Sequence, residues 1–300
     1  MENKEGSFQG VGGLELFCQS WRGEGRSRAA LASIHGFGEH SGRYMNVVNR
    51  LAPQGYGTYG FDLRGHGRSP GQRGHINSWD EYRRDVKSFL HLISNQEPNH
   101  PVFMLGHSMG ALIALDYLLH DPAGLRGAII SGTPLEPIGV AKPFLVMLAR
   151  VLSRVWPRFS LPLGLDTKGI SRDMEVVKAY EADPLVHGKT TVRWGTEILQ
   201  TIEWVKAHAE QVSIPLLLIH GGSDPLNSPN GTRSFFDKIT FPDKEMKIYP
   251  GSYHEAHNDL DYTQVVNDVA QWLERLREYN APAFPTNGKK GGGSSLESGD

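Results

Sequence analysis

A serine in a glycine-flanked turn is the first residue in this sequence that could act as a nucleophile. Residues 106–110 are Gly-His-Ser-Met-Gly, a match to G-x-S-x-G centred on Ser108. In a sequence with 35 glycines, this match alone is weak evidence for a catalytic serine. Its context is stronger, because the apolar segment Val102–Leu105 precedes it and a helical pattern from Ser108 to His120 follows. A strand, a tight turn and a helix expose a serine hydroxyl at a helix N-terminus, which favours negative charge.

A serine hydroxyl needs a base, and the base needs a group that orients it. In this architecture the chain order is serine, then a carboxylate, then histidine. Asp224 follows an apolar segment within HGGSDPL, and His254 follows the next one within YPGSYHEAHND. Both lie after strand ends, which places them at the same edge of a parallel sheet as Ser108. We therefore predict a triad of Ser108, Asp224 and His254.

Other assignments of these roles stay open at this stage. His257 lies three residues after His254 and could be the base instead. Asp224 could be an ordinary turn residue, since Pro225 follows it. Three rival carboxylates fit less well. Asp259 and Asp261 follow the histidines and so break the expected order. Asp243 lies beside a strand start, at the wrong end of the sheet.

An oxyanion formed at the serine would need two backbone donors. One is predicted to be the N–H of Met109, the residue after the nucleophile. The other is predicted to be the N–H of Phe37, in a loop where Gly36 and Gly38 allow the backbone a close approach.

Metal and cofactor motifs are not found. The 13 histidines are scattered, there is a single cysteine, and His254 and His257 lack the spacing of H-E-x-x-H. The segment Gly188-Lys189-Thr190 resembles the end of a P-loop, but position 183 holds Asp183 where that motif needs glycine. We expect neither a metal nor a cofactor.

Short apolar segments alternate with helical patterns along most of the chain. Strands are predicted at Leu31–His35, Gly57–Phe61, Val102–Leu105, Gly127–Ser131, Pro215–His220 and Met246–Tyr249, with an edge strand at Leu14–Ser20. Helices are predicted after a capping box formed by Ser78 and Glu81, at 108–120 and at 262–278. This alternation predicts an α/β fold with a mostly parallel central sheet and helices on both faces.

One long segment interrupts the alternation. Between Ser131 and Ile214 we predict only helices, and assign 134–205 to a helical cap over the carboxyl edge of the sheet. The core is then 1–133 with 206–280, and the Gly/Ser-rich 281–300 is predicted to be a flexible tail typical of an expression scar. The apolar run Phe144–Leu148 in the cap is predicted to touch lipid aggregates transiently, or else to cover an acyl tunnel.

Composition excludes several classes of partner. A net charge of −2 over 300 residues gives no electrostatic basis for binding nucleic acid. The N-terminal residues lack the apolar region of a secretory signal, and no apolar run is long enough to span a bilayer. One cysteine cannot form an intrachain disulfide, which fits a cytoplasmic protein that is peripheral to membranes at most.

Several sequence blocks together resemble a known family. They are HGFGEHSGRY (35–44), GHGRSPGQRG (65–74), GHSMGA (106–111), SRDMEVVKAYEADPLV (171–186), HGGSDPL (220–226) and YHEAHND (253–259). In this order they resemble the α/β-hydrolase fold and, within it, the monoacylglycerol lipase group of serine hydrolases. The resemblance covers about 10–278. One departure is Ala111, where the family usually has glycine.

The resemblance implies the same triad and the same oxyanion donors, with a mobile cap over an apolar acyl tunnel. It also implies a small polar pocket for a glycerol head group at Glu39, Arg43, Tyr180 and His257. The expected activity is cleavage of monoacylglycerol-like esters to fatty acid and glycerol through an acyl-enzyme. A lysophospholipase, in which Arg43 would tolerate the phosphate, and a broad carboxylesterase are the alternatives. Two further alternatives are a prolyl aminopeptidase-like hydrolase and a non-catalytic binding protein with the same fold.

Overall fold

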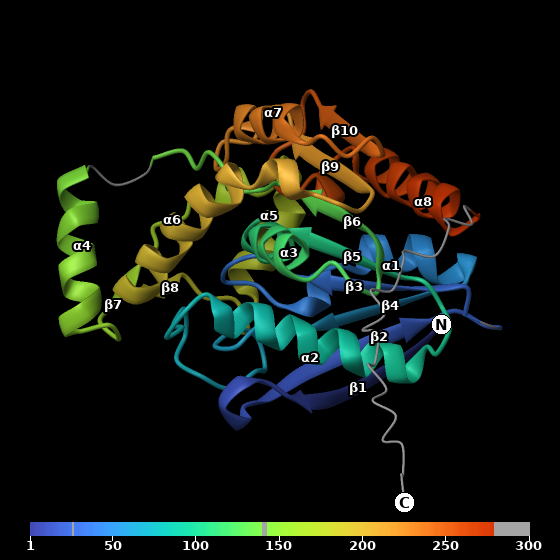
Figure 1. Cartoon of the computed structure of the whole chain (residues 1–300), viewed down its shortest axis with the longest axis horizontal. Coiled ribbons are helices and arrows are strands. Elements are labelled where there is room, and N and C mark those ends of the chain that lie inside the picture. The colour runs from blue at the N-terminus through green and yellow to red at the C-terminus, as the bar shows by residue number, and fades with distance from the viewer. Residues whose placement is uncertain (26, 140–142, 279–300) are drawn as a thin grey trace, which may run out of the picture.

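The computed structural model describes residues 1–25, 27–139 and 143–278, without the side chains of 143–145 and 278. In this part of the chain an eight-stranded sheet has the order β1-β2-β4-β3-β5-β6-β9-β10 (Figure 1). The strands are β1 (Glu2–Gln9), β2 (Glu15–Arg22), β3 (Ala29–Ile34), β4 (Tyr56–Phe61), β5 (Val102–His107), β6 (Leu125–Ser131), β9 (Leu216–Gly221) and β10 (Lys244–Tyr249). In this order, all neighbouring strands from β4 to β10 are parallel. β2 is antiparallel to both of its neighbours, β1 and β4.

Helices cover both faces of the sheet, as predicted. On one face α1 (Met45–Leu51) and α8 (Tyr262–Glu278) pack against each other and on the strands. On the other lie α2 (Asp80–Gln96), α3 (Met109–His120) and α7 (Pro229–Lys238). Short 3-10 turns are η1 (Val11–Gly13), η2 (Ser41–Arg43), η3 (Ala52–Gln54), η4 (Thr167–Gly169), η5 (Ala209–Gln211) and η6 (Ala256–Asn258). Burial on both faces explains why the central strands are apolar throughout.

The N-terminal edge of the sheet differs from the prediction. The segment predicted as an edge strand forms β2, which lies second, because β1 pairs outside it along its whole length. The sequence of β1, ENKEGSFQ, has only Phe8 buried against the core. An exposed edge strand of polar residues has no apolar pattern, so the sequence gives no sign of it.

The segment between β6 and β9 holds α4 (Pro143–Val155), β7 (Ser160–Pro162), α5 (Met174–Ala182), β8 (Lys189–Thr191) and α6 (Val192–Ala207). The expectation of helices alone is wrong here, because β7 and β8 pair as a small antiparallel sheet. Three-residue strands are too short to show a periodicity. The division at 134–205 stays a prediction, and the predicted tail at 281–300 lies outside the described residues.

The predicted capping box before α2 does not form. The N-cap of α2 is Trp79, without a side-chain cap, and the Glu81 carboxylate instead accepts from the backbone N–H of Asn77 at 2.9 Å. A buried ion pair attaches this helix to the loop after β4. Arg64 donates to Asp85 at 2.6 and 2.8 Å, and Asp85 also accepts from the N–H of Val11.

Removing one partner of this ion pair is expected to destabilise the fold strongly. Asp85→Ala leaves the buried Arg64 guanidinium with only the Glu81 carboxylate, at 3.2 Å, as an anionic partner, and we expect this to cost about 3–5 kcal/mol of unfolding free energy. Urea denaturation measures this loss. The matched control is Asp243→Ala at the exposed pair with Arg275, where we expect less than about 1 kcal/mol. A loss for Asp85→Ala as small as the control's would contradict this account.

Candidate active site

Ser108 lies in the turn between β5 and α3 with a backbone conformation that is rare for a non-glycine residue. Its φ is +53° and its ψ is −119°. A Cβ at Gly106 would lie 2.4 Å from the carbonyl oxygen of Gly110, and a Cβ at Gly110 would lie 2.1 Å from that of Ile34. Both positions therefore require glycine, because any side chain would collide with backbone. The turn places Ser108 at the N-terminus of α3, partly exposed between buried neighbours.

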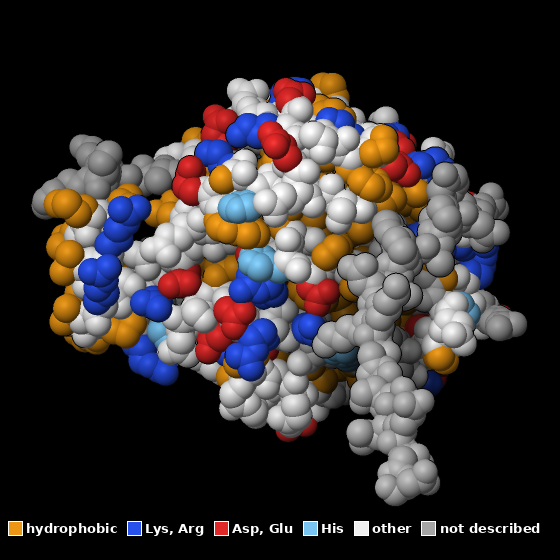
Figure 2. Space-filling view, viewed as in Figure 1, with side chains coloured by type: hydrophobic (Ala, Val, Ile, Leu, Met, Phe, Trp, Pro, Cys, Tyr) orange, Lys and Arg blue, Asp and Glu red, His pale blue; other side chains and the backbone are white. Residues whose placement is uncertain are grey.

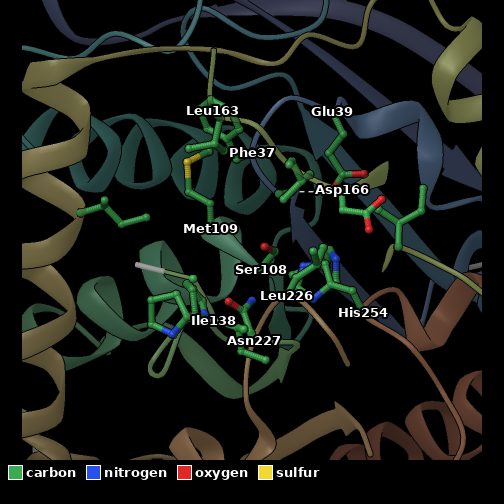
Figure 3. Close-up of a pocket in the computed structure, with 18 of the residues that line it drawn as sticks. Phe37, Glu39, Ser108, Met109, Ile138, Leu163, Asp166, Leu226, Asn227 and His254 are labelled. Carbon is green, nitrogen blue, oxygen red and sulfur yellow. Dashed lines mark hydrogen bonds between the residues drawn. The ribbon is translucent and has the colours of Figure 1, made fainter. Parts of the chain in front are cut away.

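A cavity of about 610 Å³ opens in front of this serine (Figure 3). Ser108, His254 and Glu39 come from separate loops of the sheet and meet there. Most of the remaining wall is apolar and comes partly from the segment between β6 and β9, including Ile138, Leu163, Leu165, Ile170, Trp194, Ile198, Leu199 and Ile202. Such a cavity suits an apolar chain at one end and a few polar contacts at the other.

The predicted base and orienter are in contact. The Nδ1 atom of His254 lies 2.7 Å from Oδ2 of Asp224, and both side chains are buried. The other carboxylate oxygen accepts the backbone N–H groups of Leu226 at 2.8 Å and Asn227 at 3.1 Å. Asp224 is thus held by its own turn and is also hydrogen-bonded to the histidine, and its catalytic role stays a prediction.

The electrostatics of this pair suit a base. Burial alone would raise the pKa of Asp224, but the neighbouring His254 and hydrogen bonds from His220 and His254 lower it well below its ordinary value. Burial disfavours the charged form of His254, but the Asp224 carboxylate outweighs this effect and raises the pKa of His254 above its ordinary value of 6.5. The imidazole therefore accepts a proton more readily than a free histidine does.

The sequence did not reveal a second histidine beside the carboxylate. His220, at the end of β9, has its Nε2 3.1 Å from Oδ2 of Asp224 and its Nδ1 2.7 Å from the hydroxyl of Thr232. Its position directly before the loop of Asp224 was the available signal. It contacts the same carboxylate oxygen as His254 does, so it helps to position Asp224.

The rival base, His257, occupies a different place. Its ring stacks on Tyr44 at a centroid distance of 5.1 Å and contacts the ring of His107 at 4.8 Å. Burial lowers its pKa, and no carboxylate hydrogen bond to its ring is present among the described residues. This arrangement favours His254 as the base.

The predicted oxyanion donors flank the serine in the cavity. Phe37 and Met109 both line it, and Met109 is the first residue of α3, where the N–H has no helical partner. Two contacts hold the Phe37 loop in place. The N–H of Gly36 donates to the Glu39 carboxylate at 2.6 Å, and the rings of Phe37 and Trp194 pack at a centroid distance of 4.5 Å. The roles of these two N–H groups stay predictions.

The four residues expected to hold a head group divide into two pairs. Glu39 and Tyr180 line the cavity, whereas Arg43 and His257 lie behind its wall and are not among the lining residues. Glu255 lines the cavity instead, and sequence reasoning missed it although it directly follows His254. The polar end of the cavity therefore differs in composition from the set that the resemblance implied.

The raised pKa of His254 predicts a pH dependence. If the neutral imidazole is the base, kcat/KM for a soluble ester falls as the pH decreases through a pKa above 6.5. Asp224→Asn should shift this midpoint downward, because the charge that raises the pKa is gone, and should lower kcat by on the order of 10⁴-fold. A pH–rate profile of both proteins measures this. An unchanged midpoint in Asp224→Asn would count against the pair.

Comparison with known proteins gives consistent matches over most of the chain. The family described as serine aminopeptidase, S33 matches residues 25–261. A monoacylglycerol lipase of Mycolicibacterium smegmatis is 35% identical over 90% of this chain and 96% of that protein. Among solved structures, the monoacylglycerol lipase of Paleococcus ferrophilus has a TM-score of 0.79 and 32% identity, covering 92% of this chain and 100% of that one.

A soluble variant of the Saccharomyces cerevisiae monoglyceride lipase, solved with a substrate analogue, has a TM-score of 0.81 and 26% identity over 91% of this chain and 94% of that one. The family match covers the sheet from β3 to β10, the loops that form the cavity and the segment between β6 and β9. This chain therefore belongs to the serine hydrolase family described as serine aminopeptidase, S33 and, within it, to the monoacylglycerol lipase-like enzymes of the α/β-hydrolase fold.

Proposed function

We propose that this chain hydrolyses monoacylglycerols to fatty acid and glycerol. The observation that carries the proposal is the cavity, which joins Ser108 and His254 to a long apolar wall on one side and to Glu39, Tyr180 and Glu255 on the other. The apolar wall accommodates an acyl chain, and the polar end accommodates hydroxyl groups. The relatives named as monoacylglycerol lipases support this choice of substrate.

The geometry supports an acyl-enzyme mechanism. Ser108 Oγ attacks the ester carbonyl while Nε2 of His254 takes the hydroxyl proton, and Asp224 stabilises the resulting imidazolium. The N–H groups of Phe37 and Met109 bind the oxyanion. The imidazolium then donates its proton to the departing glycerol oxygen, which leaves an acyl-Ser108 ester. Water, deprotonated by His254, attacks this ester, and the imidazolium returns the proton to Ser108 Oγ as the fatty acid leaves.

Glycerol release from a long-chain monoacylglycerol tests the function. We expect turnover by the unaltered chain and a loss of at least about 10³-fold in Ser108→Ala, since the nucleophile is gone. A lysophospholipid, a short aryl ester and a prolyl arylamide run alongside. The lysophospholipid tests the lysophospholipase alternative, the aryl ester a broad carboxylesterase and the arylamide an aminopeptidase. Faster hydrolysis of any of these than of monoacylglycerol would overturn the proposal.

A surface on α4, which packs against the cavity-lining helix α6, supports contact with lipid aggregates. On α4 and just after it, Met147, Leu148, Val151, Val155 and Trp156 are each more than half exposed. Figure 2 shows hydrophobic side chains along the outer edge of α4, with basic side chains beside them. Within the predicted run Phe144–Leu148, the side chains of Phe144 and Leu145 lie outside the described residues.

We therefore propose that α4 touches membranes or micelles while substrate enters, and that the protein works in the cytoplasm at such surfaces. A helix with one exposed apolar face and flanking cations is typical of interfacial binding. In the described ranges no helix has the length and hydropathy needed to cross a bilayer.

Liposome co-sedimentation tests this contact. Leu148→Asp with Val151→Asp should reduce the bound fraction severalfold, because two charges would enter the apolar interface. Activity on a soluble aryl ester should not change, which separates binding from catalysis. A bound fraction equal to that of the unaltered chain would rule out this surface.

A further inference from the structure

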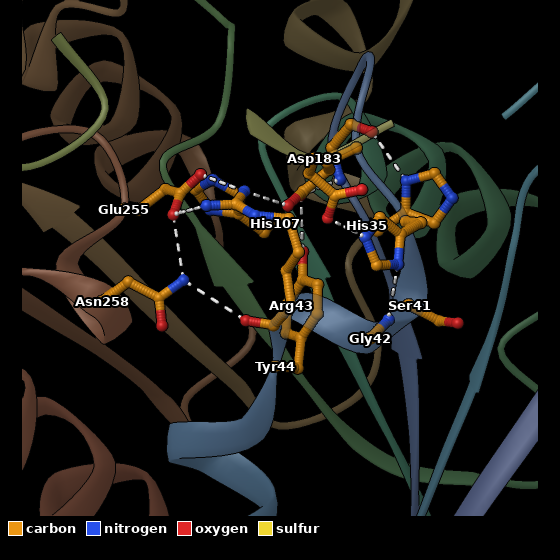
Figure 4. Close-up of polar contacts among 12 residues, drawn as sticks. His35, Ser41, Gly42, Arg43, Tyr44, His107, Asp183, Glu255 and Asn258 are labelled. Carbon is orange, nitrogen blue, oxygen red and sulfur yellow. Dashed lines mark hydrogen bonds and ion pairs between the residues drawn. The ribbon is translucent and has the colours of Figure 1, made fainter. Parts of the chain in front are cut away.

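A cluster of three charged side chains lies behind the polar end of the cavity. Arg43 donates through Nη1 to Glu39 at 2.7 Å and to Glu255 at 2.6 Å, and through Nη2 to Glu255 at 2.9 Å (Figure 4). The side chains of Arg43, Glu39 and Glu255 are only 11%, 3% and 3% exposed. The two carboxylates come from loops far apart in the sequence and share this one guanidinium.

The guanidinium of Arg43 is not free to bind an incoming anion. One face of it lies over the ring of Tyr180 at 4.6 Å, and the two carboxylates occupy its edge. Arg43 is also absent from the residues that line the cavity. A phosphate could reach this charge only by displacing Glu39 or Glu255, which would leave that carboxylate buried without its partner.

The cluster therefore carries one unbalanced negative charge. His107 and His257 do not offset it, because burial lowers the pKa values of both. The pKa of the third adjacent histidine, His254, is raised, but this side chain is paired with Asp224. Glu39 and Glu255 line the cavity, and the exposed Asp166 is a third carboxylate in its lining. Over the described part of the chain, the lining contains no lysine or arginine.

Buried carboxylates treat neutral and anionic head groups differently. A glycerol hydroxyl can donate a hydrogen bond to a carboxylate oxygen, whereas a phosphate diester or dianion has no proton to donate. A second negative charge a few ångströms away is repelled far more strongly than in water, because the site has a low dielectric constant.

We propose that Glu255, acting with Glu39, makes the head-group end of this cavity exclude anionic esters, and is thus a specificity-determining residue. The proposal rests on the proposed function, and it assigns to this site a class of substrate: neutral polyol monoesters, with lysophospholipids rejected. Asn258 holds Glu255 in place by donating to its carboxylate at 2.9 Å. Glu39 has a second task, since it accepts from the N–H of Gly36 in the oxyanion loop, so Glu255 is the better position to change.

The test compares two esters with the same short acyl chain, kept below the concentration at which they aggregate. They are monooctanoylglycerol and its glycerol phosphate analogue. For the unaltered chain we expect kcat/KM for the neutral ester to exceed that for the phosphate by at least about tenfold. Glu255→Gln, which keeps the shape and one acceptor, should reduce this ratio at least about fivefold by raising the rate with the phosphate.

Two controls separate charge in the site from other effects. Glu203→Gln removes one negative charge from an exposed position on α6, where the side chain is 73% exposed, and should leave the ratio unchanged. Hydrolysis of p-nitrophenyl butyrate, which has no glycerol head, reports whether the triad of Glu255→Gln is intact. A folded Glu255→Gln with an unchanged ratio would overturn the proposal.

A measurement on the unaltered chain keeps the proposal testable if Glu255→Gln does not fold. Octyl glycerol ether and its phosphate are compared as competitive inhibitors of p-nitrophenyl butyrate hydrolysis. We expect the inhibition constant of the phosphate to be at least about tenfold higher. Equal constants would overturn the charge proposal alone, whereas failure to hydrolyse monooctanoylglycerol at all would overturn the proposed function.

Discussion

The close approach of α3 to β3 is the constraint on which the candidate site depends. Gly110 lies so near the carbonyl oxygen of Ile34 that no side chain fits, and only this contact lets the helix begin immediately after the strand. Ser108 must then adopt a positive φ, at a cost on the order of 1–3 kcal/mol. Burial of nearly all of α3 in the core offsets that cost. The proposed nucleophile is thus held in place by the most buried helix of the described fold.

The loops that complete the site are tied to the segment between β6 and β9. The N–H of His254 donates to Gly169 O at 3.3 Å, and that of Glu255 donates to Ile170 O at 2.7 Å. Ser171 donates to the carbonyl oxygen of Asn258 at 3.1 Å. The loop that carries the proposed base is therefore hydrogen-bonded to a neighbour that also lines the cavity. A displacement of this part of the segment would move His254 relative to Asp224.

The buried carboxylates around the cavity differ in how their charges are compensated. Asp224 is compensated by two histidines, so the site can hold a carboxylate and still raise the pKa of His254. Arg43 compensates one of its two carboxylates and is not among the residues that line the cavity. A buried cation that is already paired with two carboxylates stabilises these partners, and an incoming anion would have to compete with them. Its presence in the sequence block near Phe37 therefore does not by itself indicate a phosphate site.

The sequence by itself determined the features that depend on short stretches of chain. The turn at Ser108 follows from two glycines and a strand beside them, and the parallel sheet follows from repeated buried segments between helices. The placement of Asp224 and His254 near Ser108 also followed, because parallel strands end at one edge of a sheet. The polar edge strand β1 and the short pair β7–β8 could not be predicted from the sequence, since neither has a periodic pattern of apolar residues.

Only the tertiary structure decided which charged groups face the cavity. Arg43 and Glu255 are 212 residues apart, and nothing in either local sequence indicates that they pair. Their pairing takes Arg43 out of the cavity wall and brings Glu255 into the lining, which changes the charge that a substrate meets. The physical reason is that strand order and backbone turns are set by local geometry and burial. The net charge of a pocket instead depends on which distant side chains share a desolvated contact.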